Sequence, residues 1–318
     1  MIGANALPFS EAVDTTAASS EPNEPLTPCQ SLSLDRTAWY KFTPASDESI
    51  TVNAGNPSNT VVAVYTGSSV SNLSQVACHF SFTTFHADAG TTYYIQTGIE
   101  QGSGRTGTPI QFSVAATPPP TVNFGFFPSD PNTFDNILFI DFSSDPGGLG
   151  FSSWTWTFGD GTSSTGPSVS HQYANDGDYT VKLSVETPDG RSGEFSQTVS
   201  VRTHDVVIKK FTVPTSARSG QTRQISVGIS NRHYPETVQV LVLRSVPNEQ
   251  NALVGELTQQ VPVLPTGRTA TFNYNYTFSS ADAAVGKVTF FAVANISGHK
   301  DALPSDNEAI SLPTKVIG

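Results

Sequence analysis

Several aspartates in this chain are placed where they could hold a metal ion. Asp141, Asp145, Asp176 and Asp178 lie near the glycine and serine residues that are typical of turns. Carboxylate oxygens on loops are ligands that Ca²⁺ prefers, so these residues are candidates for a structural calcium site. The sequence lacks the run of alternating aspartates with a distal glutamate that marks a dedicated calcium loop. Scattered surface aspartates are also normal in an acidic protein, so both interpretations stay open, and we expect no other cofactor.

Nucleophilic catalysis is a second possible chemistry, for which the chain offers Cys78 with His79 or His86 as a base. The sequence has no GxSxG, HExxH or phosphate-binding GxxxxGK motif, and no GxGxxG motif that opens a helix. A disulfide between Cys29 and Cys78, the only cysteines, would remove the nucleophile. The residues around the two cysteines have the composition of an extracellular protein, which favours a disulfide. The alternative is that the two cysteines are separate buried thiols. We therefore expect a protein that is not an enzyme.

The composition argues against two further classes of function. The chain has 318 residues and a formal net charge of -11, and no basic cluster is larger than Lys209 and Lys210. Binding to nucleic acid through its phosphate groups is therefore not expected. No apolar run reaches the roughly 18–20 residues that span a membrane. The first eight residues lack the pattern of a signal peptide, so we expect either a mature piece or another export route.

The apolar residues around position 156 predict strands that are buried on one face. Trp154, Trp156 and Phe158 alternate with threonines, and positions 179–185 alternate in the same way. Between these strands, Asp160 lies between two glycines and is expected to accept hydrogen bonds from its own turn. The whole stretch resembles the signature of the PKD domain, an immunoglobulin-like sandwich of secreted and surface proteins. The resemblance implies structural roles for Trp156, Gly159, Asp160, Gly161, His171, Tyr173, Gly177 and Tyr179.

His171 has a second possible interpretation. A histidine two residues before a tyrosine could act as a ligand or as a proton relay. The resemblance to the PKD domain instead implies a histidine that packs beside the sheet with a ring nitrogen bonded to the backbone. We favour this structural role.

Two breaks in the pattern divide the chain. Residues 117–121 form a proline-rich linker, and the alternation restarts after residues 202–205. Short β-branched and aromatic segments separated by Gly, Pro, Asn and Ser occur on both sides of each break. The sequence therefore predicts an all-β protein with three tandem antiparallel β-sandwich domains at residues 1–116, 122–202 and 203–318.

Two of these domains resemble further families. Residues 20–25, 37–44, 61–67 and 89–96 resemble the jelly-roll-like pre-peptidase C-terminal domain. The last domain resembles the immunoglobulin-like CARDB module of bacterial adhesion proteins, and the residues that carry this resemblance are 204–207, 219–222, 225–231, 267–272 and 301–308. These resemblances imply jelly-roll-like and immunoglobulin-like sandwiches in a secreted protein.

The favoured function is a non-catalytic extracellular structural or adhesive protein of a prokaryotic cell surface. Its expected partners are other surface proteins or copies of itself, bound through edge strands and loops, and possible glycans. Residues 309–316 near the carboxyl terminus are an expected edge. Two alternatives are an accessory region of a secreted hydrolase, and a polymerising subunit of an extracellular filament, sheath or virion-associated appendage.

Overall fold

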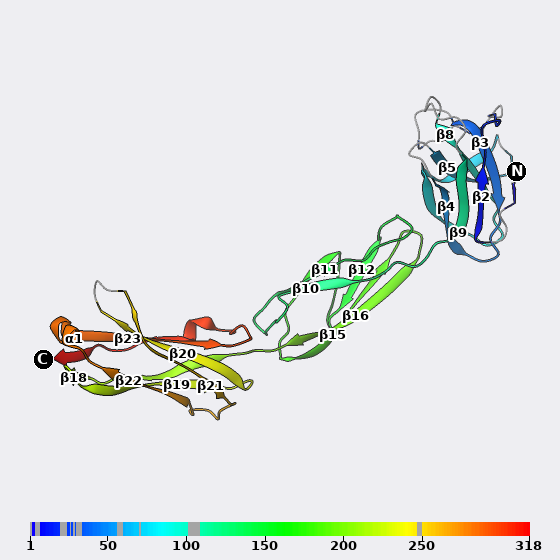
Figure 1. Cartoon of the computed structure of the whole chain (residues 1–318). Coiled ribbons are helices and arrows are strands. Elements are labelled where there is room, and N and C mark those ends of the chain that lie inside the picture. Colours follow the sequence, from blue (N-terminus) through cyan, green and yellow to red (C-terminus); the bar gives the residue numbers. More distant parts are fainter. Residues whose placement is uncertain are drawn as a thin grey trace. The chain divides into compact units, whose positions relative to one another are not determined.

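The computed structural model describes residues 2–3, 7–19, 24–25, 27, 29, 34–55, 60–69, 71–100, 109–246 and 250–318 (Figure 1). Within these residues the only helices are α1 (Ser280–Val285) and the 3-10 helix η1 (Pro304–Asp306). All other regular elements are strands, which pair mainly in the antiparallel direction. The predicted fold class, an all-β protein made of β-sandwiches, is confirmed.

The contacts within the chain define two compact units. The first unit joins Met1–Gly125 with Phe139–Val169 and Thr180–Gln197, and the second joins Phe126–Leu138 and Ser170–Tyr179 with Thr198–Gly318. The sheets themselves fall into three successive pairs along the chain, and strands of the middle pair belong to both units. The three domain boundaries given above therefore stay a prediction.

The first pair of sheets has the strand orders β1-β3-β8-β5-β6 and β2-β9-β4-β7. Alternate side chains of the two sheets face one another, and Tyr40 stacks on Phe112 in this core with ring centroids 3.6 Å apart. Most of residues 20–25, which support the first resemblance, lie outside the described residues. The strands are β1 (Ile2–Gly3), β2 (Phe9–Val13), β3 (Leu34–Phe42), β4 (Glu48–Gly55), β5 (Thr60–Gly67), β6 (Leu73–Phe80), β7 (Phe82–Ala87), β8 (Tyr93–Glu100) and β9 (Ile110–Ala116).

The middle pair of sheets has the orders β10-β11-β14 and β13-β12-β15-β16. Trp156 is fully buried, lies opposite Leu183 in the register of β12 and β15, and donates from Nε1 to Gly166 O over 2.9 Å. Its ring contacts Phe124 and Phe139 at centroid distances of 5.0 Å and 5.8 Å. The strands are β10 (Phe124–Phe127), β11 (Ile137–Asp141), β12 (Ser153–Thr157), β13 (Ser163–Thr165), β14 (Ser168–His171), β15 (Gly177–Glu186) and β16 (Ser192–Val201).

The third pair of sheets has the orders β17-β19-β22 and β18-β25-β23-β20-β21, with β24 also paired to β23. α1 begins at a capping box in which Ser279 and Asp282 exchange hydrogen bonds. Asp282 is fully buried and pairs with Arg244 Nε at 2.8 Å. The strands are β17 (Val206–Thr212), β18 (Ser216–Arg218), β19 (Thr222–Asn231), β20 (Glu236–Ser245), β21 (Ala252–Val261), β22 (Ala270–Thr277), β23 (Lys287–Ile296), β24 (Glu308–Ile310) and β25 (Thr314–Ile317).

The expectation that residues 309–316 form a free edge is wrong for the terminal strand β25, which lies between β18 and β23 in its sheet. β24, by contrast, pairs only with β23 among the described residues. Val316 is 3% exposed and belongs to the core of this sheet pair. The terminal strand completes the sandwich, because its backbone groups and its apolar side chain already have partners.

A buried ion-pair network lies in the first unit. Arg191 Nη1 donates to Asp145 Oδ1 over 2.7 Å and to Pro118 O over 2.8 Å, and Nε donates to Asp189 Oδ2 over 2.8 Å. The Arg191 side chain is only 8% exposed. Burial by itself would raise the pKa of the Asp145 carboxyl, but hydrogen bonds from Arg191 and from backbone N–H groups lower it below its usual value. The Arg191 guanidinium therefore connects the proline-rich segment to the carboxylates of Asp145 and Asp189 through hydrogen bonds.

The aromatic core generates a first prediction. Trp156→Ala should destabilise the middle sheets by about 3–5 kcal/mol, because it leaves a large cavity among buried aromatic rings. Thr155→Ala on the same strand is the control, since Thr155 is exposed. Circular dichroism and calorimetry of the full chain would measure the melting transitions. An unchanged melting profile for Trp156→Ala would show that this register is wrong.

The ion-pair network generates a second prediction. Arg191→Met should cost about 3–5 kcal/mol near neutral pH, because it leaves buried carboxylates without a cation. Folding lowers the pKa of Asp145 and of Asp189, so the stabilisation that Arg191 supplies is fully present above the unfolded carboxyl pKa of about 4 and declines as the pH falls below it. Urea unfolding at a series of pH values measures the difference between the two proteins.

Lys182→Met is the matched control for this experiment. Lys182 Nζ lies 3.1 Å from Glu194 Oε2, but the two side chains are 42% and 66% exposed. The loss of this surface pair should cost less than about 1 kcal/mol. A difference between Arg191→Met and wild type that stays constant from neutral to acid pH would contradict the assigned role of the carboxylates.

Candidate functional site

The residues of the PKD-like turn have a structural arrangement. Asp160 Oδ1 accepts hydrogen bonds from Thr162 N over 3.0 Å and from Thr162 Oγ1 over 2.6 Å. Gly159 has a φ of 81°, and a Cβ there would lie 2.8 Å from Thr180 O. The position therefore requires glycine both for its left-handed backbone and for the close approach of β15. Gly161, with a φ of 91°, has the same backbone requirement.

His171 belongs to a packed aromatic group. The edge of its ring meets Tyr173 with centroids 4.5 Å apart, and Tyr173 stacks on Tyr179 at 3.9 Å. Tyr173 is fully buried, and Tyr179 Oη donates to Asn175 O over 2.8 Å. Gly177 leaves room beside the Tyr179 ring, since a Cβ there would lie 3.3 Å from it. These contacts support the packing role of His171.

Asp141 and Asp145, two of the calcium candidates, are bonded to donors. Trp154 Nε1 donates to Asp141 Oδ2 over 2.7 Å, and Ser143 N donates to Asp141 Oδ1 over 2.8 Å. Asp145 accepts from Arg191 and from backbone N–H groups of its own turn. These bonds fix the two carboxylates within the sandwich structure.

Asp176 and Asp178, the other two candidates, are bonded in the same way. Asp176 accepts from Thr203 Oγ1 over 2.6 Å and from Tyr234 Oη over 2.8 Å, and Asp178 Oδ1 accepts from Arg202 Nη2 over 2.6 Å. Burial acts to raise the pKa of the Asp176 carboxyl, but the hydrogen bonds lower it below its ordinary value. None of the four candidates belongs to a group of converging metal-ligand atoms in the part of the chain that the structure describes.

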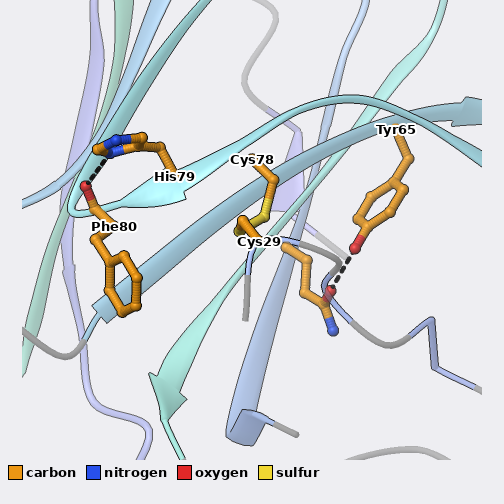
Figure 2. The surroundings of a disulfide bond; sticks show 6 residues. Cys29, Tyr65, Cys78, His79 and Phe80 are labelled. Atoms are coloured by element: carbon orange, nitrogen blue, oxygen red, sulfur yellow. Dashed lines mark hydrogen bonds between the residues drawn. A yellow bond between two sulfur atoms is a disulfide. The ribbon is translucent and has the colours of Figure 1, made fainter. Parts of the chain in front are cut away.

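Cys78, the candidate nucleophile, forms a disulfide bond. Cys29 and Cys78 are joined, with their Cα atoms 5.7 Å apart, and no cysteine is free (Figure 2). His79 Nδ1 lies 3.0 Å from Phe80 O, so this histidine is bound to the backbone beside the disulfide (Figure 2). His86 is about half exposed and lies 3.8 Å from Asp88. The Cys78–histidine pair therefore offers no thiolate for catalysis.

Two groups of possible metal ligands converge elsewhere in the described residues. The first contains Asp130, His204 and His299, and the second contains Asp205, Asp301 and Asp306. The sequence analysis did not single out either group for metal binding. A signal was present for the second group, because its residues lie within segments 204–207 and 301–308, which carry the CARDB resemblance. The two segments are separated by about 95 residues in the sequence, and a local sequence pattern does not show that residues so far apart lie together in the fold.

The first group is poorly arranged for a single metal ion. The rings of His204 and His299 stack with centroids 3.8 Å apart and planes 5° apart. Nitrogen lone pairs lie in the ring plane, so the lone pairs of two stacked, nearly parallel rings lie in separate planes and do not converge on one point. His204 Nδ1 pairs with Glu236 Oε1 at 2.5 Å, and His299 Nδ1 pairs with Asp130 Oδ2 at 3.2 Å. These polar pairs account for the group without a metal.

Two further properties concern membrane-spanning helices and the chemistry that the polar side chains offer. Among the described residues, no helix has the length and apolar character needed to cross a membrane. The ring and carboxylate groups discussed above are held by structural bonds, and no nucleophile with a neighbouring base is found among them.

The comparisons with known proteins give one family match, in the middle of the chain. Residues 117–203 match the family model of the PKD domain. The PKD1 domain of Vibrio anguillarum Epp is 26% identical, and the match covers 27% of this chain and 95% of that chain with a TM-score of 0.24. The PKD1 domain of the Vibrio cholerae metalloprotease PrtV is 27% identical, with coverages of 26% and 98% and a TM-score of 0.24.

A broader likeness extends to other sandwich modules. The fibronectin(III)-like modules of Clostridium thermocellum CbhA are 16% identical, and the match covers 61% of this chain and 93% of that chain with a TM-score of 0.31. No curated protein matches the sequence. This all-β chain therefore contains a PKD domain at residues 117–203.

Proposed function

We propose that the protein is a non-catalytic, extracellular structural or adhesive component of a prokaryotic cell surface, and that it binds a second copy of itself along an exposed sheet edge. The observation that carries this proposal is strand β21. It comes last in its sheet and, among the described residues, pairs only with β20. Its free side can therefore accept a strand from another molecule.

The side chains of β21 favour such pairing. Leu253 and Leu257 are 59% and 41% exposed, although both lie in a regular strand. Within Ala252–Val261 the only charged residue is Glu256, and the strand contains no proline or lysine. Charged side chains and proline are the usual means by which proteins protect an edge from pairing. The pairing of β21 with β20 shifts register between Val242 and Leu243, but a ten-residue edge without proline or lysine is still suited to contact.

The extracellular location has separate support. The Cys29–Cys78 disulfide is typical of oxidising compartments. The PKD match at residues 117–203 is to a domain type of secreted and surface proteins. The non-catalytic role is supported by the absence of a free thiol among the described residues and by the structural bonds of the candidate acid and base groups.

The proposed contact along β21 can be tested by placing charged residues on this strand. Leu253→Lys combined with Leu257→Lys should weaken self-association at least about tenfold, because lysines on an edge must be desolvated when a neighbouring strand pairs. Leu312→Lys is the matched control, since Leu312 is 84% exposed and lies outside any strand. Analytical ultracentrifugation over a concentration series, with immobilised wild-type protein as a second assay, measures the association. Equal association of the double variant and wild type would eliminate the β21 mechanism.

The proposed non-catalytic role can be tested by measuring whether the protein turns over hydrolase substrates. The purified chain should not hydrolyse peptide, glycoside or ester substrates, because no nucleophile, base and oxyanion donors converge among the groups described above. A hydrolase screen with chromogenic substrates of each class measures this. Turnover that one point substitution abolishes would show that the protein is an enzyme.

A further inference from the structure

Three aspartates from distant parts of the sequence meet at one end of the third pair of sheets. Asp205 directly precedes β17, Asp301 follows β23, and Asp306 ends η1. One carboxylate oxygen of each lies within 4.8 Å of the others. All three residues belong to the second unit.

Backbone hydrogen bonds hold the segments of this cluster in place. Ala302 N donates to His204 O over 2.8 Å, and Val206 N donates to Asp301 Oδ2 over 3.1 Å. Leu303 N donates to Asp301 Oδ1 over 2.8 Å. Each Asp301 oxygen therefore keeps one lone pair for another partner. The cluster is part of the fold and does not depend on flexible side chains alone.

Buried acceptors without donors provide the second, independent observation. The Oδ1 atoms of Asp205 and Asp306 are buried, and neither has a hydrogen-bond partner among the described residues. Asn307, which follows Asp306, is 5% exposed, and its Oδ1 is likewise buried without a partner. Buried polar atoms in folded proteins nearly always have a partner. Two of these oxygens belong to residues of the acidic cluster, and a cation bound there would supply the partner that they lack.

The electrostatic environment agrees with this requirement. Burial raises the pKa of the Asp205 carboxyl to about 6, and repulsion from Asp306 and Asp301 adds to the effect. Burial and the Asp301 charge also raise the pKa of Asp306. Lys209, Arg232 and His233 line the same pocket as Asp205 and Asp306, and all three are exposed to solvent, so their opposing effect on the carboxylates is screened. The three carboxylates therefore repel one another.

We propose that Asp205, Asp301 and Asp306 bind one calcium ion, which connects the start of β17 to the segment after β23. Carboxylate oxygens without nitrogen or sulfur ligands favour a hard cation. Ca²⁺ accepts irregular sets of oxygen ligands, whereas Mg²⁺ demands a nearly ideal octahedron and gives up its water reluctantly, so a set of three carboxylates from separate segments favours Ca²⁺. Water is available to complete the coordination.

Calcium titration of the full chain, after treatment with EDTA, tests the site. Calorimetry should show one ion bound with a Kd on the order of 10⁻⁴–10⁻³ M, as in other extracellular modules, and calcium should raise the melting temperature. Asp205→Asn and Asp306→Asn should each weaken binding at least about tenfold. Glu308→Gln is the matched control, because Glu308 is an exposed carboxylate two residues from Asp306 and lies outside the cluster.

A measurement without calcium separates loss of the ligand from misfolding. In EDTA, Asp306→Asn should unfold at the same temperature as wild type or at a higher one, because the substitution removes repulsion between like charges. The proposal is overturned if about 10 mM CaCl₂ gives wild type neither heat of binding nor a rise in melting temperature. It is also overturned if the Asn variants keep the full calcium response, or if Glu308→Gln loses it equally.

Discussion

The burial of alternate side chains between two facing sheets is the interaction on which the rest of this structure depends. Each of the three sheet pairs has strands that bury every second residue in the core, as β9, β11 and β20 do, whereas the central strand β5 is buried on both faces. Large aromatic residues fill the middle of these cores, as Trp156 does between Phe124 and Phe139. Because the apolar residues are used for the cores, polar and charged groups are left to the turns, ends and edges.

This arrangement determines where charged groups occur. The guanidinium of Arg191 donates to Pro118 O in the proline-rich segment and neutralises the carboxylates of Asp145 and Asp189. All three charged side chains are almost completely buried. At the end of the third sheet pair, Asp205, Asp301 and Asp306 meet without an equivalent buried cation among the described residues. The two clusters have similar carboxylates and differ in their counter-ion. The carboxylates of the first are neutralised by a buried arginine, whereas those of the second are suited to an ion from solution.

The same arrangement determines which surfaces are free for contact. The two outer strands of a sheet have backbone groups on one side without a partner in the sheet, unless a turn or helix covers them. The terminal strand β25 is not such an edge, because it fills a gap between β18 and β23. β21 is an edge, and it exposes leucines. The calcium ion proposed at Asp205, Asp301 and Asp306 and the contact proposed along β21 are independent of each other, and either can exist without the other.

The sequence by itself determined the all-β architecture and the core of the middle sheets. The alternation of Trp154, Trp156 and Phe158 is a local property, since the side chains of a strand point to opposite faces at every step. Only two cysteines are present, so the Cys29–Cys78 pairing could also be proposed from the sequence. Tertiary structure alone decided that Asp145 pairs with Arg191, that β25 is internal, and that Asp205 meets Asp301 and Asp306. These outcomes depend on which distant strands pair, and local periodicity carries no information about the pairing of segments about a hundred residues apart.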